Sequence, residues 1–141
     1  MTNKKIKNII HKEELYASVF NLEEIAEGLD FLTNDESFIQ VGTWKYEKGK
    51  VLDAHYHNTY ERKAYLTQEV VIVLNGTILC NLFTLERDFI TTVEVKEKQL
   101  IIQYQGIQEY EIIEDSKIIE VKNGPYFGPD KDRTRVDVKK D

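Results

Sequence analysis

From residue 37 onward, short stretches of alternating apolar and polar residues are separated by polar turns, which predicts a series of β-strands. The predicted strands cover residues 37–46, 50–57, 65–74, 77–85, 89–95, 99–104, 107–113 and 117–122. The run over 65–74 is almost continuously apolar after Glu69, which is typical of a strand buried on both faces. Asn75-Gly76 then predicts a two-residue type I′ turn, with strand 77–85 returning antiparallel to the preceding one. Evenly spaced strands with little helix favour an all-β sandwich or barrel.

The chain before residue 37 is more weakly patterned, and residues 16–20 predict an extended edge segment. One short helix is predicted after Asn21, because Asn21 can cap it, Glu24 can complete a capping box and Gly28 can end it. Residues beyond 123 form an irregular loop and a tail too charged to pack. We therefore expect a single domain with an N-terminal extension (1–36), a barrel (37–123) and a C-terminal loop and charged tail (124–141).

Composition narrows the classes of function. The 141 residues carry a net charge of −6, which argues against binding to a nucleic-acid backbone. The sequence contains neither a signal-peptide core nor an apolar run long enough to span a membrane, so no membrane partner is expected. The single cysteine, Cys80, excludes an internal disulfide and falls in a predicted strand, where a buried and inert thiol is expected. These features predict a cytoplasmic protein.

Candidate chemistry gathers around His55-Tyr56-His57. In a strand, alternate side chains share a face, so His55 and His57 are expected to point the same way. Glu69 on the following strand faces the same side as Val71 and Val73, where a carboxylate needs a cation or a hydrogen-bond network. Imidazole and carboxylate groups together suit a transition-metal ion. The residues therefore predict three ligands of a metal site.

Residues 49–76 resemble the first motif of the cupin superfamily. Gly49 is followed after five residues by the His-x-His pair, and Glu69 is followed after six residues by Gly76, as in that motif. The departure is the separation of His57 from Glu69 by eleven residues, which we interpret as a polar loop at the mouth of the barrel. The resemblance implies a double-stranded β-helix, that is, a jelly-roll barrel of the RmlC-like type found in small bacterial cupins.

The second cupin motif normally supplies a further histidine, and the matching stretch here has none. Counting from Gly106 places Glu109 at that position, whereas counting back from the aromatic residue Tyr110 places Gln108 there. We favour Gln108, since it then shares an inward face with Tyr110 and Ile112. The implied metal ligands are His55, His57, Glu69 and Gln108, and the implied cofactor is a divalent metal ion such as Zn, Ni, Mn or Fe.

Three kinds of function stay open at this point. The first is a metal-dependent isomerase or epimerase acting on a small polar, sugar-derived ligand of carbohydrate or surface-polysaccharide metabolism. The second is a metal-free sugar-nucleotide isomerase in which His57 and Tyr110 transfer protons. The third is a non-catalytic ligand-binding cupin. In each of them, Glu61 and Arg62 in the inserted loop, together with Glu109, are candidate ligand-binding residues. The resemblance also implies a homodimer formed through residues 5–20.

Overall fold

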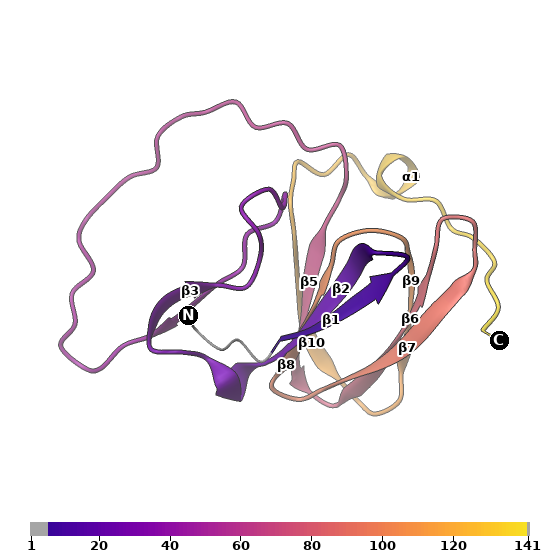
Figure 1. Ribbon diagram of the computed structural model, residues 1–141, viewed down its shortest axis with the longest axis horizontal. Helices are drawn as coiled ribbons and strands as arrows, with labels where there is room; N and C mark the ends of the chain where they lie inside the picture. Colours follow the sequence, from indigo (N-terminus) through magenta and orange to yellow (C-terminus); the bar gives the residue numbers. More distant parts are fainter. Residues whose placement is uncertain (1–5, 141) are drawn as a thin grey trace.

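The computed structural model describes residues 6–140, so residues 1–5 and 141, which belong to the predicted N-terminal extension and tail, lie outside the described residues. The described chain is built almost entirely from antiparallel strands (Figure 1). Its elements are β1 (Ile6–His11), β2 (Glu14–Asn21), the 3-10 turn η1 (Leu22–Glu24), β3 (Gly28–Phe31), β4 (Gly42–Lys45), β5 (Glu69–Asn75), β6 (Thr77–Phe83), β7 (Phe89–Lys96), β8 (Gln99–Gln103), β9 (Ile107–Ile112), β10 (Lys117–Lys122) and α1 (Pro129–Asp132). Within residues 6–140, no helix is long and apolar enough to cross a membrane.

Two sheets form a sandwich. One sheet has the strand order β1-β2-β8-β5-β10 and the other has the order β7-β6-β9, while β3 and β4 form a separate hairpin. The two larger sheets share one apolar core, made by Ile9, Ala17, Val19, Val71, Val73, Ile78, Cys80, Leu82, Val93, Val95 and Ile101. The all-β expectation is therefore confirmed as two packed antiparallel sheets. The closed jelly-roll barrel stays a prediction.

Strand β5 lies inside the five-stranded sheet and is covered on both faces, as its continuous apolar run predicts. Val71 and Val73 point into the core between the sheets. Val70 points the other way, into a second apolar cluster in which Leu32 and Ile39 from the chain before β4 cover the outer face of the sheet. Burial on both faces fixes the position of Glu69, the first residue of this strand.

The turn after β5 differs from the expected hairpin. Strand β5 pairs with β8 and β10, and β6 pairs with β7 and β9, so Asn75-Gly76 is a corner that carries the chain from one sheet to the other. Only Gly76 of this pair has a positive φ, of 91°, whereas a type I′ turn needs two. The hairpin turn with two positive φ values is Lys12-Glu13, which joins β1 to β2 at φ 49° and 67°.

The N-terminal region is more ordered than its sequence pattern predicts. Residues 16–20 do not form an edge segment, because β2 lies between β1 and β8 and all five residues are buried. The predicted helix is a single 3-10 turn. Asn21 does cap it, accepting a hydrogen bond of 2.9 Å from the Glu23 N–H, but Ile25 already has an extended backbone. The six residues between Asn21 and Gly28 form too short a segment to offset the free-energy cost of nucleating an α-helix.

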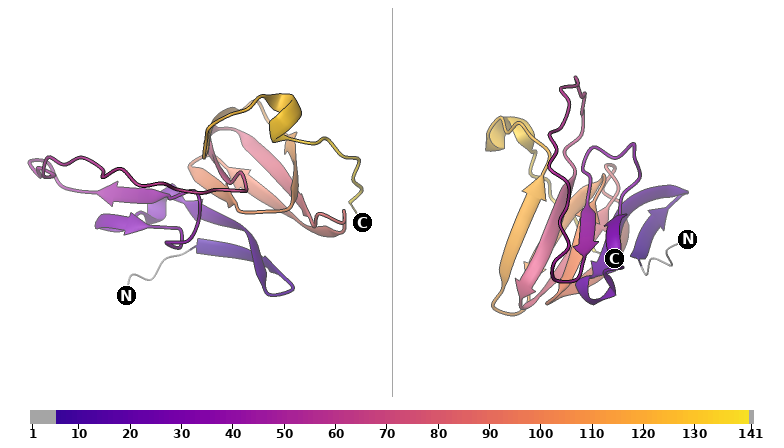
Figure 2. Two further views of the ribbon diagram at one scale, coloured as in Figure 1. Left: turned by 90° about the horizontal axis from the view of Figure 1, so that it is seen from above. Right: turned by 90° about the vertical axis from the view of Figure 1, so that its left-hand side faces the viewer.

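The segment between β4 and β5 is the largest departure. Residues 46–66, here called the arm, contain no strand and extend to one side of the sandwich (Figures 1 and 2). The strand predicted over 50–57 is therefore absent from the described chain, although the residues are extended and alternate as a strand does. A strand needs a neighbouring edge that takes up its backbone hydrogen bonds, and the arm lies against none.

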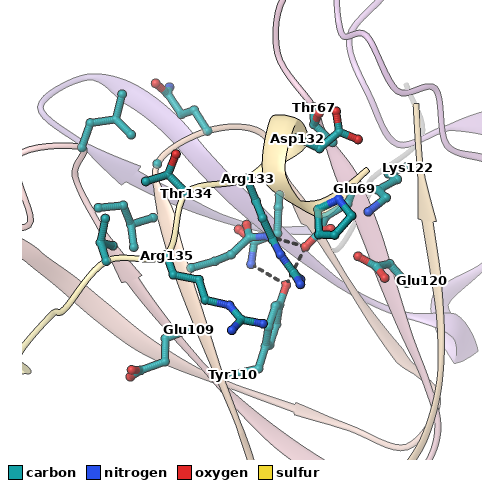
Figure 3. Close-up of a pocket in the computed structure, with 18 of the residues that line it drawn as sticks. Thr67, Glu69, Glu109, Tyr110, Glu120, Lys122, Asp132, Arg133, Thr134 and Arg135 are labelled. Carbon is teal, nitrogen blue, oxygen red and sulfur yellow. Dashed lines mark hydrogen bonds between the residues drawn. The ribbon is translucent and has the colours of Figure 1, made fainter. Parts of the chain in front are cut away.

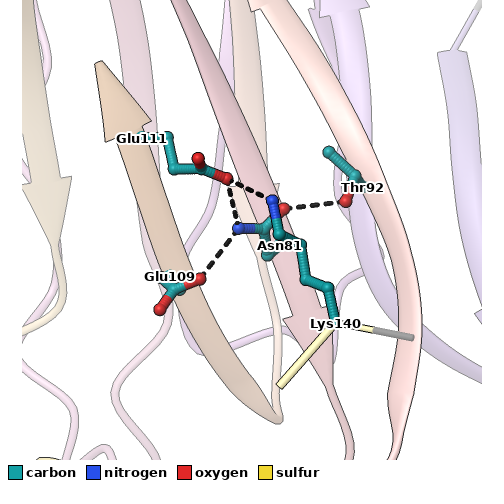
Figure 4. Close-up of polar contacts among 5 residues, drawn as sticks. All are labelled: Asn81, Thr92, Glu109, Glu111 and Lys140. Atoms are coloured by element: carbon teal, nitrogen blue, oxygen red, sulfur yellow. Dashed lines mark hydrogen bonds and ion pairs between the residues drawn. The ribbon is translucent and has the colours of Figure 1, made fainter. Parts of the chain in front are cut away.

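The charged C-terminal tail packs on the sandwich, contrary to expectation. Its Lys140 Nζ lies 2.7 Å from Glu111 Oε2 on the outer face of β9. Asn81 Nδ2 donates to the same carboxylate at 2.8 Å and to Glu109 Oε1 at 2.9 Å, and its Oδ1 accepts from Thr92 (Figure 4). These bonds hold the end of the tail against the three-stranded sheet.

Candidate active site

A polar pocket opens at one end of the sandwich. Its walls come from the start of β5, the end of β8, the start of β9 and the end of β10, and the segment from Asn123 to Val138 crosses above them. The cavity measures about 1010 Å³, enough for a ligand the size of a sugar phosphate or larger. Figure 3 shows Arg133, Glu120 and Lys122 around Glu69, whereas Glu109 points away from it.

Glu69 is the innermost carboxyl group of the pocket, and its residue is only 7% exposed. Gln108 Nε2 donates a hydrogen bond to Glu69 Oε1. The Tyr110 hydroxyl donates to the same oxygen at 3.3 Å. Gln108 and Tyr110 are two residues apart on β9, so strand alternation presents both to the pocket.

The environment of Glu69 brings its pKa close to neutral pH. Burial and, next in size, the neighbouring Glu120 carboxyl group raise the pKa of Glu69 to about 7, although the Tyr110 hydrogen bond and the charge of Lys122 act in the opposite direction. At neutral pH the group therefore exists in both protonated and ionised forms, the condition under which a carboxyl group transfers protons in either direction.

Tyr110 has a different character, because burial raises its pKa above the ordinary value for a phenol. Its hydroxyl therefore stays protonated and acts as a hydrogen-bond donor to Glu69. The same hydroxyl accepts a bond of 3.0 Å from Gln103 Nε2, which also lies 2.9 Å from Cys80 Sγ. A chain of hydrogen bonds from Gln103 through Tyr110 thus orients the Glu69 carboxyl group.

Three cationic side chains lie at the mouth of the pocket, among the acidic Glu120, Asp132 and Asp137. Lys122 comes from β10, and Arg133 and Arg135 come from the tail (Figure 3). Both arginines are exposed, so their guanidinium groups are available to a ligand. The tail is held in place by Lys140 and by a bond of 3.4 Å from Arg87 Nη1 to the Asp137 carbonyl oxygen. An anionic group fits this mouth, with the planar guanidinium forks as donors.

The structure brings together some of the predicted site residues and separates others. Glu69, Gln108 and Tyr110 meet in the pocket. Glu109 lies at the edge of the same pocket, but it faces the other side of β9, where it accepts the bond from Asn81. His55 and His57 lie exposed on the arm, their ring centroids 5.3 Å apart, and His55 Nδ1 lies 3.0 Å from the Asp53 carbonyl oxygen.

The two candidate residues of the inserted loop also lie on the arm. Glu61 Oε1 is 3.9 Å from Lys63 Nζ, and the Arg62 guanidinium carbon is 5.9 Å from the centre of the Tyr60 ring. All four side chains are exposed. In one chain, these residues contact each other and not the pocket that holds Glu69.

A metal ion does not fit the donor set that one chain presents. Over residues 6–140, no three His, Cys, Asp or Glu side chains lie close enough together to hold an ion. Glu69 Oε1 already accepts hydrogen bonds from Gln108 and Tyr110. Within a single chain, the described residues of the pocket therefore present one buried carboxyl group, Glu69, and no cluster of metal-ligating side chains around it.

Several residues of the pocket escaped sequence analysis. Glu120 and Lys122 alternate onto the inner face of β10, and that spacing of two was a usable signal. Gln103 is the last residue of β8, and nothing in the sequence distinguishes it from an ordinary core-strand residue. The sequence around Arg133 and Arg135 does not indicate a place in the pocket, because that place depends on where the tail crosses the sandwich.

The raised pKa of Glu69 makes a prediction about stability. Between the ordinary value of 4.5 and about 7 the folded protein binds a proton that the unfolded chain releases, so this group's contribution falls as the pH rises through that window. We expect Glu69→Gln to gain about 1–3 kcal/mol in unfolding free energy relative to wild type between pH 5 and pH 8, measured by urea denaturation. The exposed Glu94→Gln is the control. A difference between Glu69→Gln and wild type that does not change with pH would contradict the shift.

Comparisons of the chain with models of protein families, with curated protein sequences and with solved structures find no match.

Proposed function

We propose that this protein is an isomerase or epimerase that moves a proton at a carbon next to a carbonyl group of a small anionic ligand. The observation that carries the proposal is a buried carboxyl group, Glu69, with a pKa of about 7 inside a pocket bordered by three cationic side chains. A group with that pKa at neutral pH can take up a proton and return it with little energetic penalty in either direction.

The residues divide into three roles. The Glu69 carboxylate takes the proton from carbon, leaving an enolate, and then returns it to the neighbouring carbon or to the opposite face of the same carbon. Tyr110 and Gln108 hold the carboxyl group through its Oε1 atom. Arg133, Arg135 and Lys122 bind the anionic part of the ligand and offset the negative charge that develops on the enolate oxygen.

The resemblance to cupins supports a sugar-derived ligand, and a phosphate or diphosphate group would supply the charge that the arginines match. The direct test incubates the protein in D₂O with phosphorylated aldoses and ketoses and with nucleoside-diphosphate-linked keto sugars. Deuterium incorporation next to the carbonyl group, followed by proton NMR, is the expected result for at least one of them. Binding without incorporation would favour the non-catalytic alternative.

Chelation separates the two catalytic alternatives in the same assay. Proton transfer by Glu69 predicts incorporation that persists after treatment with EDTA. Incorporation that is lost on chelation and restored by Zn, Ni, Mn or Fe would favour the metal-dependent isomerase instead. Metal analysis of protein purified without a histidine tag gives the occupancy independently.

The arginines make a separate binding prediction. We expect the double variant Arg133→Ala/Arg135→Ala to raise the dissociation constant for inorganic pyrophosphate by about 10-fold or more, because it removes two charge-assisted donors. Isothermal titration calorimetry at low salt measures it. Lys131→Ala, two residues before Arg133 in the same tail and outside the pocket lining, is the control. Unchanged affinity in the double variant would place anion binding elsewhere.

A further inference from the structure

The sandwich is open along one side. Within the described chain, β9 pairs only with β6 and β10 pairs only with β5, so each sheet ends in a free edge at this side. Ile112 lies on the inward face of β9 together with Gln108 and Tyr110, yet it is 58% exposed. An inward-facing isoleucine in contact with solvent indicates that the interior lacks a covering strand here.

The arm has exposed apolar side chains and backbone groups that no neighbouring strand covers. Val51 is 79% exposed and Tyr56 is 85% exposed, although residues 50–57 alternate in the way of a half-buried strand. Among the described residues, the only backbone–backbone hydrogen bond within the arm runs from the Lys50 N–H to the Glu47 carbonyl oxygen, at 3.3 Å. The arm therefore offers a row of backbone groups without a strand partner and an exposed apolar side chain, Val51, on the face that it shares with His55 and His57, and β9 offers an open edge.

Charge matches the two surfaces. Residues 107–122, which contain both free edges, carry five acidic side chains and two lysines. Residues 46–66 carry four lysines and arginines and three acidic side chains, in addition to two histidines. The edges are thus net negative and the arm net positive, so their approach is electrostatically favourable.

We infer that the arm of one chain adds a strand to the β9 edge of a second copy of this chain, reciprocally, in a strand-exchanged dimer. The arm leaves the sandwich beside the β3–β4 hairpin and extends away from the body of its own chain (Figures 1 and 2). Both ends of the arm are joined to its own chain, so its middle residues, which lie about ten residues from either end, can reach at most about 35 Å, enough to contact a second body alongside. In a reciprocal exchange, a twofold axis relates the two chains, and each arm is buried against the other chain.

The exchange has a consequence for the pocket. A strand added beside β9 continues the same sheet, so alternate residues of the arm face the interior next to Gln108 and Tyr110. His55 and His57 share one face of the arm and can reach the partner's pocket in this way. The contribution of these imidazoles to the chemistry rests on the proposed function, whereas the docking itself does not.

The test uses a photoreactive residue, p-benzoylphenylalanine, in place of Tyr56, which keeps an aromatic side chain at that position. Equal amounts of unlabelled and ¹⁵N-labelled full-length protein are unfolded, mixed and refolded, then irradiated, digested and analysed by mass spectrometry. Exchange predicts cross-links to peptides containing residues 107–112, of which about half join a light to a heavy peptide. Light scattering should give twice the mass of one chain.

Several outcomes would overturn the exchange. Cross-links that join only peptides of the same label would show that the arm folds onto its own body, and a monomeric mass would exclude a second copy. Cross-links elsewhere than β9, or none, would exclude the edge. The photoreactive residue at Lys7 is the control and should give no cross-link to residues 107–112, because Lys7 is exposed on β1, at the opposite edge of the five-stranded sheet from β10.

A second measurement joins the exchange to the chemistry. Mixing Glu69→Gln with His55→Ala/His57→Ala should restore about a quarter of the wild-type deuterium incorporation, because half of the dimers then contain one intact site. Mixed-label cross-links without such recovery would retain the exchange and reject the role of the histidines. Incorporation without mixed-label cross-links would retain the proposed function and reject the exchange.

Discussion

Glu69→Gln is expected to lower the rate of deuterium incorporation into the ligand by about 10²–10⁴-fold, the range typical for loss of a positioned general base. Glutamine keeps the shape of the side chain and can still contact Gln108 and Tyr110, but it cannot take up a proton at neutral pH. The affinity for the ligand should change little, since the cationic side chains at the mouth remain. The loss should therefore fall on turnover and not on binding.

The pH profile tests the same assignment more sharply. If the ionised form of Glu69 starts the reaction, turnover of the wild type should rise through a pH of about 7 and then level off. Removing Lys122 with Lys122→Ala takes away a charge that lowers the Glu69 pKa, so the rise should move to higher pH. The exposed Glu94→Gln should leave both the rate and the profile unchanged. A pH profile that does not shift in Lys122→Ala would contradict the role of Glu69 as the proton-transferring group. Near-normal turnover of Glu69→Gln would contradict it as well.

The sequence predicts which face of β9 lines the pocket, and the reason is local. Strand alternation is set by the backbone alone. Gln108 and Tyr110 are two residues apart and therefore share a face of β9, whereas Glu109 lies between them and faces the other side. The continuous apolar run after Glu69 likewise indicates a strand with two covered faces, and this fixes the carboxyl group at its start.

What the sequence could not predict depends on partners that lie far along the chain. The alternation around His55 and His57 indicates a strand, but a strand forms only where an edge is available, and in one chain the arm reaches none. Arg133 and Arg135 join the pocket because Lys140 and Asp137 fix the tail over the sandwich, and these contacts span up to fifty residues. Patterns within a window of ten residues carry no information about such contacts.

The Asn75-Gly76 corner combines both cases. The dipeptide correctly indicates a tight turn with positive φ at Gly76, but its assignment to a hairpin presumes that the next strand pairs with the last one. Here β5 finds its neighbours in β8 and β10, because the apolar faces of consecutive strands are needed in different sheets. The corner, and not a hairpin, therefore transfers the chain across the core.

Gly76→Ala is expected to destabilise the protein by about 3 kcal/mol or more, enough to unfold a marginally stable domain. Two costs add at this position. The φ of 91° is strained for any residue with a Cβ atom. That Cβ would also overlap Ser116 Oγ and the Asp115 carbonyl oxygen, and it would lie 2.9 Å from Ser116 Cα. Two of these three atoms belong to the backbone between β9 and β10, so rotation of a side chain cannot relieve the overlap.

Urea denaturation of two further variants separates the two costs of Gly76→Ala. Gly28→Ala shares a positive φ, of 81°, but its Cβ would meet no atom within 4 Å, so it should cost only about 1–2 kcal/mol. Adding Ser116→Gly to Gly76→Ala removes the hydroxyl and leaves the Asp115 carbonyl oxygen in place, so stability should recover only in part. Equal losses for Gly76→Ala and Gly28→Ala would mean that the corner is loosely packed. A close approach between the corner and the β9–β10 turn would then no longer explain how the two sheets are held together at this end of the sandwich.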